Sequence, residues 1–318
     1  MKNRYSGVDI TKFFFACLIP LLHIPFENSV VIFILREFLA RLGVPFFFAI
    51  SGMFLSISLN KNGLRALFKF FARNGKLLII WIIIYLPIFI RIEYDGSIIR
   101  FIQLLLFKTP GYLWYLSSLL FASIPFAVIK DRKKLYVICG ALYIVGTLWG
   151  GGNYIWLSNG CSIYDSIFLT TRNGLFFGLP LMCVGELANK KELSNNAMLL
   201  FTMLLYYFEV IVLAYFVKLP SYVDRSMYLC IPALVLVLTN RVIHWNPKIE
   251  NAEYFRRFST SIYVTQYGCI FIAKVLFYLI NLSEPRNGIL IIVYMFTIAV
   301  GVLFGIFSFH NRIIKYLM

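Results

Sequence analysis

Long apolar runs alternate with short clusters of charged and polar residues along the whole chain. A helix that crosses a bilayer needs about 20 mostly apolar residues. The runs are rich in phenylalanine, isoleucine and leucine, and they lack the every-second-residue alternation of barrel strands. They therefore predict ten membrane-spanning helices. The predicted spans are residues 8–26, 38–59, 77–92, 113–129, 135–150, 167–188, 197–217, 227–242, 259–280 and 288–309.

The composition argues against a soluble protein. Hydrophobic residues make up 60% of the 318 residues and charged residues 14%, and the mean hydropathy is +0.81. Typical soluble domains have about 45–50% apolar and about 25% charged residues. Because ten spans leave only short connections, we expect a single domain over residues 1–318. Its fold class is an all-α, polytopic transmembrane helix bundle, with any chemistry in or beside the bilayer.

Membrane topology explains the net charge of +16. If the N-terminus is cytoplasmic, nineteen Lys and Arg residues fall in inside segments and nine in outside segments. Basic residues gather in cytoplasmic loops, so this count predicts both termini in the cytoplasm of a protein of the cell membrane. No nucleic-acid partner is expected. The six cysteines are scattered, without a CxxC motif or a Cys/His ligand spacing, so we expect neither a metal nor a disulfide framework.

Three ionisable residues mark the first span: Asp9, Lys12 and His23. Ionisable side chains are costly in hydrocarbon, so those that occur there are candidates for function. On a continuous α-helix, Lys12 and His23 would share one face, about 16 Å apart along the axis. A neutral histidine at near-neutral pH suits a general base. The alternative is a structural histidine bonded to a backbone carbonyl, and spacing alone leaves both interpretations open.

Basic residues near the ends of later spans are candidates for anion binding. Arg41, near the outer boundary of the second span, either holds an anionic group or is an ordinary interfacial arginine. The loop at 61–76 carries five basic residues at spacings of three or four, which would form a single stripe on a helix. That stripe either binds phosphates or only fixes the topology. If a cofactor binds there, Arg73 and Lys76 are the candidates.

Further polar residues fall inside the predicted spans. Glu186, Glu209, Gln266 and Lys274 are the main ones, and Glu209 could pair with Lys274 across the bundle. A carboxylate at the midplane is also typical of a proton or cation site in a transporter. Gly52, in the second span, would let another backbone approach closely.

Several segments together resemble the acyltransferase-3 family of integral-membrane acyltransferases, and their order along the chain matches that family. They are Lys12 and His23 with Gly7-Val8-Asp9-Ile10; Val44-Pro45-Phe46-Phe47-Phe48 leading to Ser51-Gly52-Met53-Phe54-Leu55; the basic stretch at Arg73 and Lys76; Leu113-Trp114-Tyr115-Leu116; and Ser261-Ile262-Tyr263-Val264. Within the family, two segments look most like the membrane portion of the membrane-bound serine racemases of vancomycin-resistance clusters. These segments are Lys2-Asn3-Arg4-Tyr5-Ser6-Gly7 and Thr171-Arg172-Asn173-Gly174-Leu175-Phe176-Phe177.

The resemblance implies an O-acyltransferase. It would move an acyl group, commonly acetyl, from cytosolic acetyl-CoA or another acyl-CoA to a hydroxyl of an extracytoplasmic acceptor such as an envelope glycan or a lipid-linked sugar. His23 would take the family's essential histidine role, with Lys12 as the paired basic residue and Asp9 beside them. Racemization is not implied, because no soluble racemase domain is expected in these residues. The charged groups of the donor would be bound by Arg41, Arg73 or Lys76.

Two positions depart from the family pattern. Tyr112 stands where many relatives have a histidine, and so does Gln266, later in the chain. If either histidine belongs to the catalytic set, the chain acts on a different acceptor or does not catalyse the transfer.

The alternative hypothesis is a transporter or exporter of an amino acid or an envelope precursor, built on the same scaffold. Glu209, Lys274 and Gln266 motivate it. Transporters often contain inverted repeats with broken helices in matching positions, and the sequence contains no such repeat.

Overall fold

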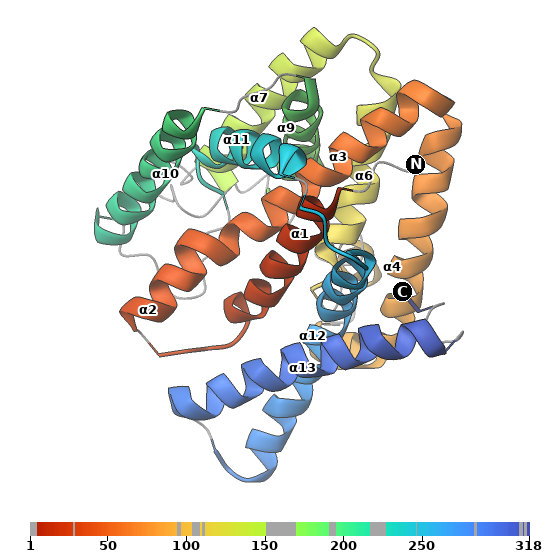
Figure 1. Cartoon of the computed structure of the whole chain (residues 1–318). Coiled ribbons are helices and arrows are strands. Elements are labelled where there is room, and N and C mark those ends of the chain that lie inside the picture. The colour runs from red at the N-terminus through yellow and green to blue at the C-terminus, as the bar shows by residue number, and fades with distance from the viewer. Residues whose placement is uncertain are drawn as a thin grey trace. The chain divides into compact units, whose positions relative to one another are not determined.

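The part of the chain that the structure describes is all-helical, without a strand (Figure 1). The computed structural model describes residues 5–27, 29–93, 97–103, 109, 112–150, 170–190, 195–216, 227–245, 247–282, 285–311, 314 and 317–318. The chain divides into two compact units: unit 1 is Met1–Val44 with Val242–Met318, and unit 2 is Pro45–Arg241. The prediction of a single domain over residues 1–318 stays a prediction.

Unit 2 holds the central part of the chain. η6 and α9 pack against both α6 and α7, and α4 packs on α6. Gly63, at φ +56°, adopts the left-handed conformation that commonly ends a helix, and it separates α3 from α4. The elements are α3 (Gly43–Asn62, which begins in unit 1), α4 (Arg65–Glu93), α5 (Ile98–Gln103), α6 (Trp114–Val128), α7 (Arg132–Gly150), η6 (Gly174–Gly178), α9 (Leu179–Lys190), α10 (Asn196–Phe216) and α11 (Ile231–His244, which ends in unit 1).

Within unit 2, α3 and α9 approach each other backbone to backbone. A Cβ atom added to Gly185 would overlap the carbonyl group of Ala49, and one added to Gly52 would overlap the backbone of Met182. Glycine at these two positions therefore lets the helices cross more closely than larger residues permit. The prediction that Gly52 admits another backbone is confirmed, and that backbone belongs to α9.

Unit 1 is built on the helices α1 (Ser6–Leu18), α12 (Glu253–Leu279) and α13 (Asn287–His310). α12 packs against both α1 and α13. Gly301 and Gly305, one turn apart on α13, lie against Ile262 and Phe258 of α12, so small residues bring these two helices close together. The segment between α1 and α3 forms the short elements η1 (Ile19–Leu22), α2 (Val30–Phe33), η2 (Ile34–Leu39) and η3 (Ala40–Leu42).

Five helical stretches among the described residues are long and apolar enough to cross a membrane: Val30–Asn62, Arg65–Ile90, Asn196–Tyr215, Glu253–Leu279 and Asn287–His310. α6 and α11 are shorter apolar helices. A helix overlaps each of the ten predicted spans, but the count of ten crossings and the cytoplasmic termini stay predictions.

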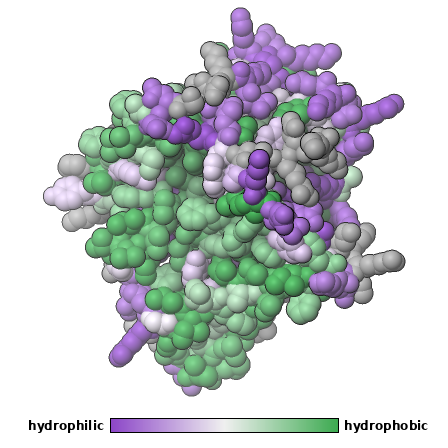
Figure 2. Space-filling view, in the orientation of Figure 1, coloured by the Kyte–Doolittle hydropathy of each residue, from purple (hydrophilic) through white to green (hydrophobic). Residues whose placement is uncertain are grey.

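The surface of α13 carries exposed apolar side chains. Ile292, Met295 and Phe307 are each more than half exposed. Figure 2 shows hydrophobic residues gathered in the lower part of the view, over α12 and α13. A contiguous apolar surface of this kind marks contact with a membrane or a partner, and here it lies on helices of spanning length.

Three boundaries differ from the predictions. The first span, expected over 8–26, changes from α-helix to 3₁₀-helix at Ile19 and ends at Leu22. Pro20 explains the change, because proline lacks the N–H that an α-helix needs. The second span, expected from residue 38, follows helical residues that begin at Val30. The basic loop expected at 61–76 is helical from Arg65, as the start of α4.

Candidate functional site

The segment from α1 to η1 carries the three residues predicted for catalysis. Asp9 and Lys12 lie on α1, His23 is the C-cap of η1, and all three are half-buried. The His23 N–H donates to the carbonyl oxygen of Pro20 at 3.0 Å. The α-helix that would place Lys12 and His23 on one face ends at Leu18, and a 3₁₀ turn leads from there to His23. The shared face and the catalytic roles stay predictions.

Arg41, predicted to hold an anionic group, forms an ion pair within unit 1. Its Nε lies 2.5 Å from Oε2 of Glu37 and its Nη2 lies 3.1 Å from Oε1, so the pair is bidentate. Glu37 is buried on the π-helical turn η2. Because this carboxylate neutralises it, Arg41 offers a ligand less positive charge than the sequence suggested. The spacing of four residues was the signal for the pair.

The two residues that depart from the family pattern, Gln266 and Tyr112, lie in different units of the chain. Gln266 is buried in α12 at 1% exposure, and its Nε2 donates to the carbonyl oxygen of Tyr263 at 3.2 Å. Its Oε1 accepts no hydrogen bond from the described residues. A buried acceptor without a donor is costly. In unit 2, Tyr112 adopts φ +60°, which is uncommon for a residue with a side chain.

Three motif segments meet in unit 2. Tyr115 of α6 donates to the carbonyl oxygen of Phe47 at 3.2 Å, and its hydroxyl shares a hydrogen bond of 3.0 Å with Oγ of Ser51 on α3. The Phe48 ring packs edge-to-face on Tyr115, with centroids 4.7 Å apart, and on Phe177, with centroids 5.8 Å apart. Such pairs add to the energy of burial, so the cluster holds Ser51 and Tyr115 in a fixed arrangement.

Arg172 and Asn173 stand at the start of the π-helical turn η6. The guanidinium carbon of Arg172 lies 4.4 Å from the centroid of the Trp114 ring, which is a cation–π contact. Asn173 is the N-cap, because its Oδ1 accepts from the N–H groups of Leu175 at 2.9 Å and Phe176 at 3.2 Å. The third motif segment therefore joins the other two. Single π-helical turns are frequent at functional sites.

An Asn173→Ala substitution is expected to destabilise the protein by about 1 kcal/mol, because two helix N–H groups lose their acceptor. Asn173→Asp keeps a side-chain acceptor and is expected to stay closer to the wild type. Thermal unfolding of the purified protein in detergent measures both variants. Equal melting temperatures for the alanine variant and the wild type would contradict the capping role.

A charged cluster that the sequence did not predict joins α7 to α9. The carboxylate of Glu186, 4% exposed, lies 3.5 Å from Nε of Arg132 and 3.1 Å from Nζ of Lys190. Lys190 also donates to the hydroxyl of Tyr136 at 2.8 Å. Burial lowers the pKa of Lys190, but its bonds to Tyr136 and Glu186 outweigh that effect and raise the pKa. The ammonium is therefore charged at neutral pH. The spacing of four residues between Glu186 and Lys190 could have predicted this ion pair from the sequence.

The other predicted polar residues of unit 2 lie on α4 and α10. Arg73 is exposed and Lys76 is half-buried on α4, and their spacing of three residues puts them on one side of the helix. The carboxylate of Glu209 accepts from the backbone N–H of Leu229 at 2.6 Å and of Cys230 at 2.8 Å. These bonds give Glu209 a structural role.

Comparison with protein families agrees with the motif segments found in the two units. A family model described as "Acyltransferase domain" matches residues 5–307, nearly the whole chain. The chain belongs to the acyltransferase-3 family. Acyltransferase-3 proteins are membrane-associated, in agreement with the apolar helices of both units. No solved structure shows significant similarity to the chain.

Bacterial racemases are among the similar proteins. An amino-acid racemase of Enterococcus faecalis is 25% identical over 280 residues, which are 80% of this chain and 39% of the relative. A serine/alanine racemase of Enterococcus gallinarum is 26% identical over 274 residues, 78% of this chain and 38% of the relative. A second amino-acid racemase of Enterococcus faecalis is 31% identical over 268 residues, 78% and 37% of the two chains. The chain thus spans less than two fifths of these relatives, which share its acyltransferase-3 domain, and the predicted resemblance is confirmed.

Proposed function

We propose that this acyltransferase-3 protein is an O-acyltransferase of the cell membrane. It moves an acyl group, acetyl in the simplest case, from cytosolic acyl-CoA to a hydroxyl of an extracytoplasmic acceptor such as an envelope glycan or a lipid-linked sugar. The observation that carries the proposal is the match of the family to residues 5–307. The surplus of basic residues in the loops assigned to the cytoplasm supports ten spans with both termini inside.

The proposed chemistry uses His23 as the general base. The acceptor hydroxyl loses its proton to the imidazole while its oxygen attacks the thioester carbonyl carbon. A C–O bond forms, the C–S bond breaks, and the proton passes from the imidazolium to the departing CoA thiolate. Lys12 and Asp9 are the charged residues of α1 proposed for the same site. A thioester is already activated, so the protein mainly has to position the two reactants and stabilise the oxyanion.

For the donor, we propose that Arg73 and Lys76 bind the CoA phosphates. Both lie on one side of α4 and belong to the basic stripe that begins before this helix. Arg41 is the weaker candidate, because Glu37 already neutralises it. Charge-assisted bonds from Arg and Lys to phosphate are among the strongest polar contacts in proteins.

We do not propose racemase activity for this chain, although its relatives are named racemases. The matched region is at most 39% of their length, and the family model that matches it describes an acyltransferase. The transporter alternative has less support, because Glu209, one of its three motivating residues, caps backbone N–H groups of its own unit.

The experiment uses membranes from cells that produce the chain, incubated with acetyl-CoA labelled in the acetyl group. The proposal predicts release of free CoA thiol and incorporation of label that mild alkali removes, as expected for an ester. Membranes from cells without the chain are the control. Label in the envelope fractions that does not exceed this control would contradict the proposal.

A further inference from the structure

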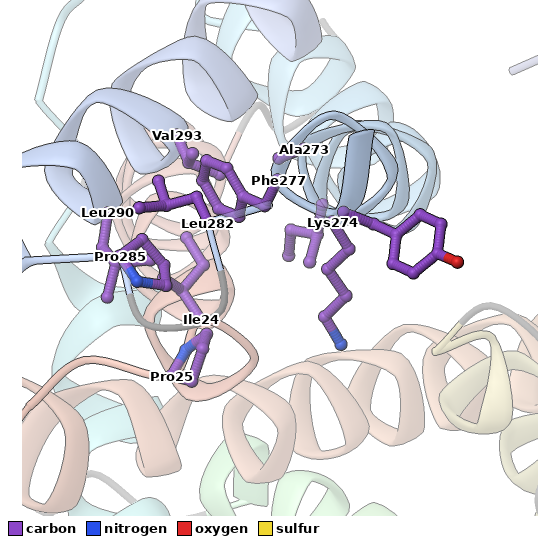
Figure 3. Close-up of a pocket in the computed structure, with 11 residues that line it drawn as sticks. Ile24, Pro25, Ala273, Lys274, Phe277, Leu282, Pro285, Leu290 and Val293 are labelled. Carbon is purple, nitrogen blue, oxygen red and sulfur yellow. The ribbon is translucent and has the colours of Figure 1, made fainter. Parts of the chain in front are cut away.

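A cavity of about 320 Å³ lies in unit 1, where α12, α13 and the segment after His23 meet. Ile24 and Pro25 form one part of its wall, Phe277 of α12 forms another, and Leu290 of α13 a third (Figure 3). The volume falls at the lower end of the range of small-molecule sites, about 300–1,000 Å³. Such sites are mostly apolar with a few polar groups that orient the ligand.

Lys274 is the charged residue of this wall. Within the described residues it forms neither an ion pair nor a hydrogen bond, and Figure 3 shows its side chain extending from α12 with the ammonium away from Leu290 and Val293. Lys274 is exposed, and the exposed apolar residues Ile272 and Leu276 lie near it on α12. A cation beside apolar surface is costly in a membrane unless an anion accompanies it. None of the described wall residues is acidic, so a ligand can supply the negative charge.

The volume limits which lipid fits. A cavity of 320 Å³ equals roughly eleven water-sized volumes at about 30 Å³ each. It therefore accepts the head-proximal part of one alkyl or isoprenoid chain, but not the two chains of a bilayer phospholipid.

We propose that this cavity binds a single-chain anionic amphiphile, with its chain against Ile24, Phe277 and Leu290 and its head group at the Lys274 ammonium. This binding does not depend on the proposed acyl transfer. If that function holds, however, a ligand in the cavity contacts the segment that directly follows His23, and it is then a candidate for the acceptor or for a regulator of the transfer.

The test uses the purified full chain in phosphatidylcholine nanodiscs with a photoactivatable analogue of dodecyl phosphate. The crosslink is expected within residues 270–293 or at residues 24–25. Dodecyl phosphate should compete with it, whereas dodecanol and a two-chain phosphatidic acid should not. Lys274→Gln should lower labelling by about tenfold, because one charge-assisted interaction is lost. Lys248→Gln, at an exposed lysine of unit 1 outside the cavity, is the charge control.

A second pair of variants tests the apolar part. Ala273→Trp fills the cavity and should abolish the label, whereas Ile272→Trp, at the adjacent residue outside the wall, should leave it unchanged. Equal competition by dodecanol or by phosphatidic acid would overturn the proposal, as would labelling that neither Lys274→Gln nor Ala273→Trp reduces. Acyl transfer is measured in the same preparations. A protein that binds the probe but transfers no acyl group is thereby distinguished from one that transfers acyl groups but does not bind the probe.

Discussion

A His23→Ala substitution is expected to lower the rate of acyl transfer by about 100-fold or more, since loss of a general base removes about two to four orders of magnitude. His23 is half-buried at the end of η1, and its backbone N–H is already bonded to Pro20. Truncating the side chain therefore removes the imidazole while the backbone bond that shapes the turn stays in place. The measurement is the initial rate of CoA release with saturating acetyl-CoA.

The matched control is Phe14→Ala on α1, because this side chain is 49% exposed on the same segment. Its transfer rate should stay near that of the wild type. Both variants are compared by membrane insertion and by melting temperature in detergent. An inserted His23→Ala protein that melts like the wild type and transfers acyl groups at an unchanged rate would remove His23 from the mechanism.

A Gly185→Leu substitution is expected to destabilise the protein by more than about 3 kcal/mol. Any Cβ at this position overlaps the carbonyl group of Ala49 on α3, and a backbone group cannot move aside as a flexible side chain can. The two helices would have to separate at their crossing, which would also disturb the contact between Gly52 and Met182. The expected result is a melting temperature at least several degrees lower, or loss of monodisperse protein on extraction.

Gly140→Leu is the control for that substitution. Gly140 lies on α7, and nothing lies within 4 Å of a Cβ built there. Leucine also has a better helix propensity than glycine, so this variant should melt at or slightly above the temperature of the wild type. The same loss of stability in both variants would show that the α3–α9 crossing is not the cause.

The positions of the helices could be predicted because an apolar run bounded by polar residues largely defines a buried or spanning helix. The short apolar helix α6 covers Trp114–Val128 against a prediction of 113–129, and α13 covers Asn287–His310 against 288–309. The change to a 3₁₀ turn at Ile19 was missed, since hydropathy contains no information about backbone geometry. Pro20 was the local signal for it.

The side-chain partners in the two units were harder to predict. Pairs within one helix, such as Glu37 with Arg41, follow from a spacing of four residues and could have been found. The hydrogen bond between Ser51 and Tyr115 joins residues 64 positions apart. It could not be derived from the residues alone, because amphipathic patterns do not say which helices become neighbours. Three of the motif segments meet in unit 2, but their order along the chain did not predict that contact.

Passage of acyl groups from a cytosolic thioester to a hydroxyl outside can be measured in sealed right-side-out vesicles that contain the chain and are loaded with acetyl-labelled acetyl-CoA. We expect alkali-labile label on envelope material accessible to a membrane-impermeant hydrolase, and about 100-fold less of it with His23→Ala. The same amount of external label in vesicles with and without the chain would contradict it.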